Sequence, residues 1–159
     1  MKPFTLVLCL LASMFSACDK DHCNQASQSD GYLIFGHYYG ECLGKNCIEI
    51  YKLDQNQLFE DTLDHYPSSN SFYIAAYIKL PQEKFNTAKD LMNYFPYDLL
   101  KEQNNVIGQP DAADGGGLYI EYNKNGVRKF WLIDQMKTNV PAKYHFFMDK
   151  VNEKIHLIE

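Results

Sequence analysis

Residues 118–133, LYIEYNKNGVRKFWLI, indicate the fold class of this 159-residue chain. Two apolar runs, Leu118 to Tyr122 and Val127 to Ile133, flank the tetrapeptide Asn123-Lys124-Asn125-Gly126. Asn-Gly between such runs is the strongest short-range signal for a β-hairpin. Aromatic and β-branched residues, which strands favour, fill both runs. The segment therefore predicts an antiparallel pair of strands.

Four further strand patterns precede this hairpin, each bounded by turn residues. Gly36 lies inside the first of them and indicates a bulge there. The third and fourth are separated by a loop that contains Pro67-Ser68-Ser69-Asn70. The four expected strands are residues 32–39, 47–53, 57–63 and 72–80.

Two segments show the apolar spacing of helices. The first follows Pro81, which suits a first helical position, and ends or kinks at Pro96. The second begins at Pro141, and its single apolar stripe is what packing on a sheet requires. The order β-β-β-β-α-β-β-α predicts one α+β domain over residues 31–159, an antiparallel meander of about six strands with two helices packed on one face. The stripe consists of Tyr144, Phe147, Met148, Val151, Ile155 and Ile158.

The first 17 residues have the composition of a signal peptide. Lys2 supplies a cationic start, and residues 4–15, FTLVLCLLASMF, carry no charge. As a helix this run would be roughly 18 Å long, which is too short to span a bilayer and suits the core of a signal peptide. The alternatives are an ordinary secretory signal and a buried helix of a cytosolic protein.

The segment Ser16-Ala17-Cys18 resembles the bacterial lipobox, although Phe15 stands where lipoboxes usually carry Leu. The resemblance implies cleavage before Cys18 and a diacylglycerol thioether on its sulfur, which would anchor the protein to a membrane. Residues 18–30 are polar and are expected to form a tether. Asp19-Lys20-Asp21 looks like the charged stretch that directs some Gram-negative lipoproteins outward, whereas Asp19 favours inner-membrane retention in enteric systems. We expect the outer membrane or the cell surface.

The overall charge argues against one class of partner. The formal net charge is −5, and loss of Lys2 with the signal peptide would make it one unit more negative. Because the chain has no cluster of Lys and Arg, it lacks the electrostatic footprint of a nucleic-acid-binding protein. We therefore expect no nucleic acid partner.

Three cysteines remain after Cys9 and Cys18 are set aside, and thiols outside the cytoplasm tend to oxidise. Cys42 and Cys47 flank a turn-prone tetrapeptide, so a Cys42–Cys47 disulfide is the expected pairing. A pairing of Cys23 with either of them is the alternative. A zinc site built from His37 and these two cysteines is disfavoured, because no second Cys pair exists.

Residues 107–117, IGQPDAADGGG, form the strongest candidate for a binding loop. Gly115 and Gly116 allow close backbone approach, and the carboxylates of Asp111 and Asp114 could offer oxygens to calcium. The pattern is neither an EF-hand nor a Walker loop. The alternative is an ordinary long connection stabilised by Asx-turns, and the sequence leaves the metal unknown.

The second candidate is His37 with Tyr38 and Tyr39, which would lie on a tyrosine-rich sheet face. The chain contains no Gly-x-Ser-x-Gly, His-Glu-x-x-His or Ser-x-x-Lys pattern. Enzymatic activity is left open, with a non-enzymatic module favoured and no cofactor expected. The alternatives are a calcium- or zinc-dependent envelope hydrolase, a calcium-stabilised domain and a purely structural lipoprotein.

Three segments of the chain resemble those of a group of small Gram-negative lipoproteins of unknown function. The resemblance spans most of the chain after Cys18 and implies kinship of fold, without any activity or catalytic residue. The expected tether, the aromatic strands and the missing catalytic motifs, and not this resemblance, favour a membrane-anchored envelope module that binds a protein, a glycan or a small ligand. The segments are FGHYYGECLGKNCIEIYKL (35–53), DAADGGGLYIEY (111–122) and GVRKFWLIDQMKTNVP (126–141).

Overall fold

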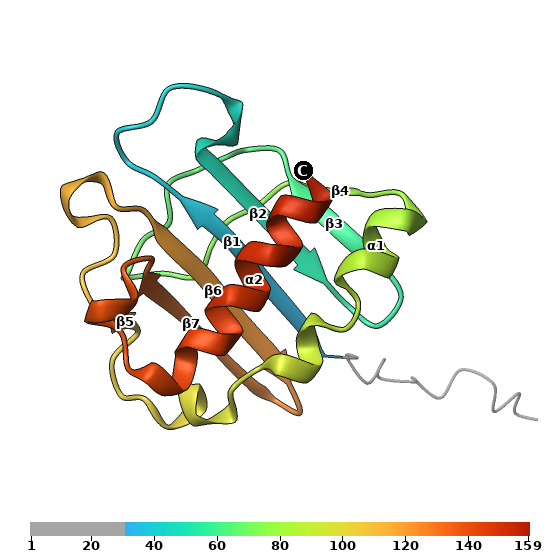
Figure 1. Cartoon of the computed structure of the whole chain (residues 1–159). Helices are drawn as coiled ribbons and strands as arrows, with labels where there is room; N and C mark the ends of the chain where they lie inside the picture. Colours follow the sequence, from blue (N-terminus) through green and yellow to red (C-terminus); the bar gives the residue numbers. More distant parts are fainter. Residues whose placement is uncertain (1–30) are drawn as a thin grey trace, which may run out of the picture.

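The computed structural model of the chain describes residues 31–159, so the expected signal peptide, Cys18, Cys23 and the tether lie outside the described residues. The described part has an α+β fold (Figure 1). Seven strands form one mixed sheet in the order β4-β3-β2-β1-β6-β7-β5. The strands are β1 (Tyr32–Tyr38), β2 (Ile48–Leu53), β3 (Leu58–Asp61), β4 (Tyr77–Lys79), β5 (Val106–Ile107), β6 (Gly117–Lys124) and β7 (Val127–Asp134). The α-helices are α1 (Gln82–Ala88) and α2 (His145–Ile158).

The expected hairpin is confirmed. β6 and β7 pair antiparallel from Gly117↔Asp134 to Lys124↔Val127. Asn125 and Gly126 form the turn with φ of 54° and 78°, a left-handed pair that Gly adopts without strain and Asn tolerates. β1 to β4 follow each other as antiparallel neighbours, as a meander requires.

The sheet departs from the sequence prediction at β5. Two residues of this strand pair parallel to β7, Val106 with Leu132 and Ile107 with Ile133. The prediction of about six antiparallel strands was therefore wrong in this one element, because a two-residue strand has no alternation of apolar and polar residues to detect.

The fourth expected strand is also shorter than the sequence predicts. Of residues 72–80 only Tyr77–Lys79 are in the sheet. The buried carboxylate of Asp61 accepts hydrogen bonds from the Tyr73 hydroxyl at 2.8 Å and from the Ala76 N–H at 2.7 Å. These bonds draw the preceding residues away from the sheet edge. Residues 62–76 instead form a connection across the sheet, which we call the strap.

Gly36 is paired in register with Ile50 on one side and Tyr119 on the other, so the expected bulge is wrong. The glycine instead allows close approach of two strands. A Cβ at this position would lie 2.0 Å from the carbonyl oxygen of Glu49 and 2.8 Å from the Cα of Ile50. Both contacts are with backbone, which cannot move aside cheaply.

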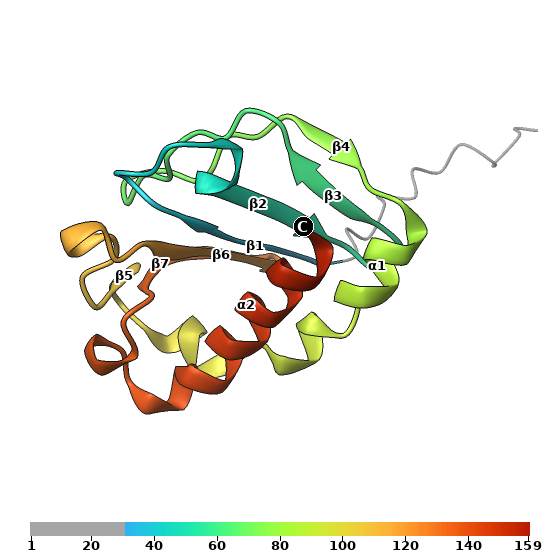
Figure 2. The same ribbon diagram turned by 45° about the horizontal axis from the view of Figure 1, so that its top comes forward.

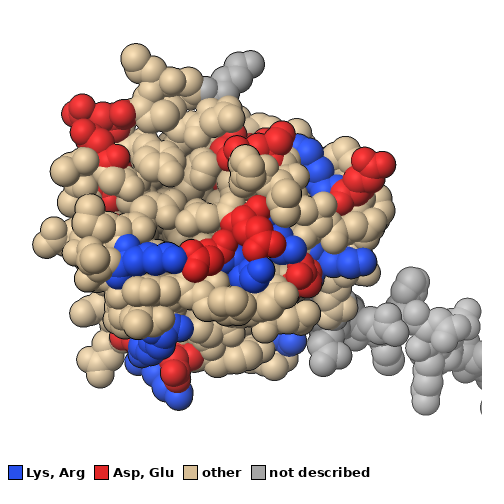
Figure 3. All heavy atoms as spheres, in the orientation of Figure 1, with Lys and Arg blue, Asp and Glu red and all other residues tan. Residues whose placement is uncertain are grey.

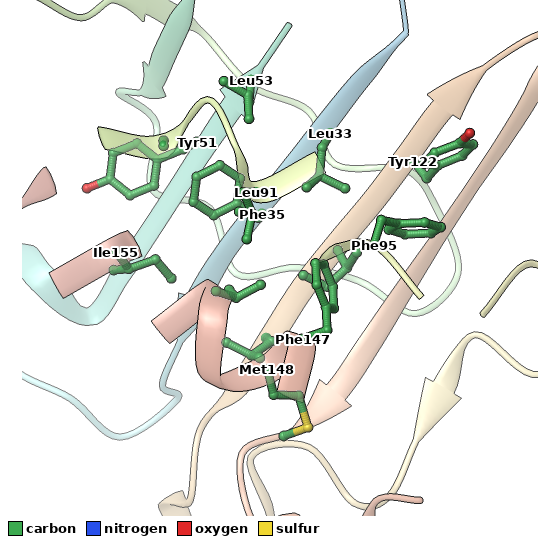
Figure 4. Close-up of a cluster of buried hydrophobic side chains, with 14 of the residues drawn as sticks. Leu33, Phe35, Tyr51, Leu53, Leu91, Phe95, Tyr122, Phe147, Met148 and Ile155 are labelled. Carbon is green, nitrogen blue, oxygen red and sulfur yellow. The ribbon is translucent and has the colours of Figure 1, made fainter. Parts of the chain in front are cut away.

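Both helices pack on the same face of the sheet, as predicted (Figure 2). Buried residues of β1, β2 and β6 point toward this face, including Phe35, Tyr51 and Tyr122 (Figure 4). Phe95 stacks on Tyr122 with ring centroids 4.5 Å apart. The stripe predicted for the last helix is buried here in full. From Tyr144 and α2 the core receives Tyr144, Phe147, Met148, Val151, Ile155 and Ile158.

The opposite face is covered by the strap and is also buried. The Tyr73 N–H donates to the Tyr119 hydroxyl oxygen at 3.0 Å, and Tyr119 donates to Glu121 at 2.8 Å. Tyr38 meets Tyr66 of the strap edge to face at 5.1 Å. β1 and β6 are thus buried on both faces. The apolar cluster under the strap contains Ile34, Tyr38, Ile50, Tyr119 and Leu132.

Within residues 31–159, neither helix has the length and apolar character that crossing a bilayer requires.

Candidate functional site

The structure brings the two candidate sites of the sequence together at one end of the sheet. β1 ends and β6 begins side by side, because Tyr38 is paired with Gly117. A Cβ at Gly116 would lie 2.2 Å from the ring of Tyr39, and one at Gly117 would lie 2.4 Å from the Tyr38 hydroxyl. The loop glycines therefore serve close packing against two tyrosines. We call this end of the sheet the Tyr38 end.

Asp111 links three segments at the Tyr38 end. Its carboxylate accepts hydrogen bonds from the Tyr66 hydroxyl at 2.7 Å, the Gly40 N–H at 2.8 Å and the Gly116 N–H at 3.1 Å. Loss of solvent and the nearby negative carboxylate raise the pKa of Tyr66 to about 12, so its hydroxyl stays a donor. Asp111 thus holds the strap, the end of β1 and the loop together.

The other predicted residues around this loop differ in exposure. Tyr38 is only 1% exposed and would reach a ligand only if the strap moved away. Asp114 and the neighbouring Ala113 are exposed and have positive φ, 58° and 51°. Gly115 has an ordinary φ of −74°. A ligand-binding role for these residues stays a prediction from the sequence.

His37 lies on the helix-bearing face, beside the disulfide loop. Its Nε2 is 3.1 Å from the carbonyl oxygen of Asn46 and 3.8 Å from Oε1 of Glu159. Its ring is 5.3 Å from that of Tyr39. The predicted disulfide is confirmed: Cys42 and Cys47 are bonded, with Cα atoms 5.6 Å apart. His37 therefore has no thiolate partners for a zinc site here.

Among residues 31–159, no three His, Cys, Asp or Glu side chains lie close enough together to hold a metal ion. The metal hypothesis for Asp111 and Asp114 therefore rests on the sequence pattern alone.

A groove beside β7 is a further candidate site, because it borders a stretch of sheet edge that β5 does not cover. Its volume is about 190 Å³, and it lies beside residues 102–105, which directly precede the short strand β5. One wall is β7, the opposite wall is the segment between Lys101 and β5, and Phe72 of the strap closes one side. The lining residues are Phe72, Glu102, Gln103, Asn104, Asn105, Arg128, Lys129, Phe130 and Trp131.

Main-chain groups of β7 point into this groove. The Leu132 N–H points away from β6 and donates to the Asn105 carbonyl at 2.8 Å. Groups along a strand alternate in direction, so the N–H and C=O of Phe130 and Arg128 also point away from β6. The β5 ladder covers only Leu132 and Ile133. The groove therefore presents an open stretch of sheet edge.

The outer wall of the groove is fixed from both sides. The Lys129 ammonium donates to the carbonyls of Leu100 at 2.7 Å and Glu102 at 3.5 Å, at the end of a 3₁₀-helix where carbonyls lack partners. The Asn105 side chain donates to the Ser69 carbonyl at 2.6 Å. Glu102 itself accepts from Lys143 and Tyr144, and these two donors hold the pKa of its carboxyl below the ordinary value.

Aromatic rings and one cation form the side of the groove on the strap face. Phe72 and Phe130 meet edge to face at 5.0 Å. The Arg128 guanidinium lies 4.0 Å from the centre of the Phe72 ring, and its Nε donates to the buried carboxylate of Glu121 at 2.8 Å. That hydrogen bond raises the pKa of Arg128 further above its ordinary value. The Arg128 side chain is 45% exposed.

The sequence contained two weak signals for this groove. Gln103, Asn104 and Asn105 form a run of amide side chains before β5, and Arg128 faces outward in the predicted hairpin. Nothing in the sequence indicated that the strap would bring Phe72 beside Phe130, because that contact depends on the crossing held by Asp61.

No protein-family model and no curated protein sequence matches this chain.

Proposed function

We propose that the protein is a cell-envelope lipoprotein, anchored through Cys18 at the outer membrane or the cell surface, and that its folded part is a non-enzymatic binding module. Its ligand is an extended segment of another envelope protein, which lies in the groove beside β7. The proposal for the anchor is supported by the signal-peptide pattern and by Ser16-Ala17-Cys18.

One observation favours a peptide over other kinds of ligand. The N–H and C=O groups of Phe130 and Arg128 lie on the edge of the sheet, point into the groove and have no partner strand. An extended peptide that adds to such an edge satisfies these groups by ladder hydrogen bonds. Its alternate side chains would contact Phe72 and Phe130 on one side and the Lys129 stem on the other. A glycan would use the same rings without requiring the backbone groups.

Arg128 favours an acidic side chain in the peptide. Its guanidinium has one N–H engaged by Glu121, which leaves the terminal amino groups for a carboxylate of the ligand. Phe72 limits the movement of the guanidinium by contact with its plane. The arginine is therefore already oriented before binding.

The anchor is tested by the intact mass of the protein isolated from its own cells. We expect a mature chain that begins at Cys18 and carries acyl chains, and we expect Cys18→Ala to abolish the lipid. A native chain that retains Met1, with Cys18 unmodified, would contradict the anchor.

The groove is tested with displayed random dodecapeptides selected on the full lipidated protein in detergent. Phe130→Pro removes one outward N–H and leaves the β6 ladder intact, because proline is tolerated at an edge whose N–H faces solvent. Phe130→Leu is the matched control, since it keeps the N–H and an apolar side chain.

We expect the selected peptides to bind Phe130→Pro at least about ten-fold more weakly than Phe130→Leu, which corresponds to the loss of roughly one well-made hydrogen bond. Equal affinities for the two variants would contradict strand addition. A glycan would bind the ring of Phe130 and not its N–H. If the protein binds an oligosaccharide on an array, and Phe130→Pro and Phe130→Leu both lose that binding equally, the ligand is a glycan and not a peptide.

A further inference from the structure

Among the side chains that the structure describes, the Lys residues without a carboxylate partner gather at the end opposite the Tyr38 end. Six Lys or Arg side chains have a carboxylate oxygen within 4.0 Å and are thereby neutralised locally. These are Lys101, Arg128, Lys137, Lys143, Lys150 and Lys154. Among the other described Lys side chains, Lys129 donates to two carbonyls, and five have no carboxylate partner within that distance. The five are Lys52, Lys79, Lys84, Lys89 and Lys124.

The sheet topology places these five lysines together. β1 begins at the end of the sheet where β2, β4 and β6 finish, because each of these strands runs opposite to β1. Lys79 and Lys124 are the last residues of β4 and β6, and Lys52 is the second-last residue of β2. Helix α1, which contains Lys84 and is followed by Lys89, comes directly after β4. We call this end the Gly31 end.

Lys124 and Lys89 lie closest to the point where the chain enters the domain. The Lys124 stem packs on Gly31, where a Cβ would lie 2.7 Å from its Cβ and Cγ. Gly31, Lys89 and Lys124 line one hollow of about 190 Å³, together with Met92. Lys89 is exposed and Lys124 is half-buried.

Two carboxylates without a Lys or Arg partner oppose the five lysines at this end, and a third, Asp90 beside Lys89, is paired with Lys154 at 2.8 Å. Asp54 accepts the N–H groups of Asn56 and Gln57, both at 2.8 Å, within the β2–β3 turn, and Glu83 lies in the first turn of α1. The balance is therefore cationic. The Tyr38 end has more carboxylates than lysines: it carries Glu41, Glu49, Asp61, Asp64, Asp111, Asp114 and Asp134, together with Lys45. Figure 3 shows acidic atoms alone at the upper left of the helix-bearing face, toward the Tyr38 end, and Lys or Arg atoms among those at the right.

We infer that the Gly31 end is a docking surface for an anionic phospholipid bilayer. The inference rests on the proposed anchor, since the 13 residues from Cys18 to Asp30 connect a membrane to this end of the domain. Their contour length is at most about 45 Å, which keeps the lysines close to the bilayer. Each Lys near an anionic surface strengthens association by about five-fold, and the acidic Tyr38 end is repelled. The domain therefore stands on the bilayer with the disulfide loop and Asp111 directed outward.

The test uses the full lipidated protein in two kinds of vesicle. One is phosphatidylcholine alone, and the other is one part phosphatidylglycerol to two parts phosphatidylcholine. Each lysine is acetylated by a water-soluble reagent, and its rate of modification is measured by mass spectrometry. We expect the rates at Lys89 and Lys124 to fall at least about five-fold in the anionic vesicles, with no fall at Lys137 and Lys150. In about 1 M salt, where the screening length is about 3 Å, the protection should disappear.

Charge reversal separates this surface from a general effect of net charge. Lys89→Glu with Lys124→Glu should abolish the protection of Lys52 and Lys79 in anionic vesicles. Lys137→Glu with Lys150→Glu changes the net charge equally and should leave that protection intact. Equal rates in the two vesicles, or equal effects of the two double variants, would overturn the inference. This result can be told apart from a failure of the proposed anchor. Without the lipid anchor, the protein would not float with phosphatidylcholine vesicles at all.

Discussion

The main-chain N–H of Tyr73 donates a hydrogen bond to the phenolic oxygen of Tyr119, and the Tyr119 hydroxyl in turn donates one to the buried carboxylate of Glu121. Tyr119 is fully buried, so one side chain connects the strap to the centre of the sheet. This contact therefore ties the largely exposed strap to the buried centre of the sheet.

Tyr119→Phe tests this connection. The substitution leaves the Tyr73 N–H without its acceptor and removes one donor from Glu121, which should lower the free energy of unfolding by about 1–3 kcal/mol. Denaturation in urea measures the loss, and faster hydrogen exchange should be confined to the strap. Tyr39→Phe, at a half-buried position, is the control and should change the stability little. Equal losses in both variants would contradict the role of Tyr119.

Ala113→Gly should stabilise the protein, although glycine usually destabilises. Ala113 has φ 51°, a left-handed conformation that costs an L-residue about 1–2 kcal/mol and glycine almost nothing. The greater freedom of glycine in the unfolded chain offsets about 0.4–1 kcal/mol of that gain. The expected net effect is a stabilisation of about 0.5–1 kcal/mol, measured as a rise in Tm. The neighbouring Ala112 does not have a positive φ, so Ala112→Gly relieves no backbone strain and should lower Tm.

Glu49→Gln should raise the stability at neutral pH and have a smaller effect in acid. Loss of solvent around Glu49, with Glu60, Glu159 and Asp64 nearby, raises the pKa of its carboxyl above the ordinary value of 4.5. The ionised Glu49 carboxylate therefore lowers the free energy of unfolding at pH values above the raised pKa. This loss of stability disappears as the pH falls through the raised pKa toward 4.5, because the carboxyl becomes protonated. Glutamine still accepts the Tyr51 hydroxyl bond. Tm measured against pH should show the two proteins converging in acid, and Glu41→Gln, at an exposed position, is the control for loss of one carboxylate at neutral pH.

Reduction of the Cys42–Cys47 disulfide should lower the free energy of unfolding by about 2 kcal/mol, as expected for a closed loop of this short length. Guanidinium unfolding with and without reductant measures the change. A double Cys42→Ser, Cys47→Ser variant should match the reduced protein and become insensitive to reductant. Continued sensitivity would show that another cysteine forms a bond that matters for stability.

Most of the secondary structure could be predicted because each long element carries its own periodic signal. The β6–β7 hairpin has Asn125-Gly126 between two long strands, and the stripe of α2 repeats over four turns. The disulfide could be predicted because its cysteines are only five positions apart in the sequence. In each case the deciding information is local.

The groove and the strap could not be predicted, because they depend on contacts between distant segments. Phe72 meets Phe130 and Asp61 meets Tyr73 only once the sheet has formed, and the short strand β5 exists only as a partner of β7. For the same reason the sequence did not predict that Asp111 accepts hydrogen bonds from three segments of the chain.

The sheet ends on both sides in very short strands, three residues in β4 and two in β5. Proteins confined to a membrane are concentrated in two dimensions and collide edge to edge, a geometry in which long bare strands would polymerise. The open stretch of β7 is recessed between Phe72 and residues 102–105, so it admits one slender chain and excludes the flat flank of a neighbouring molecule. If the proposed anchor holds the protein on a bilayer, crowded neighbours would not pair through this edge, and it would stay open to the proposed peptide.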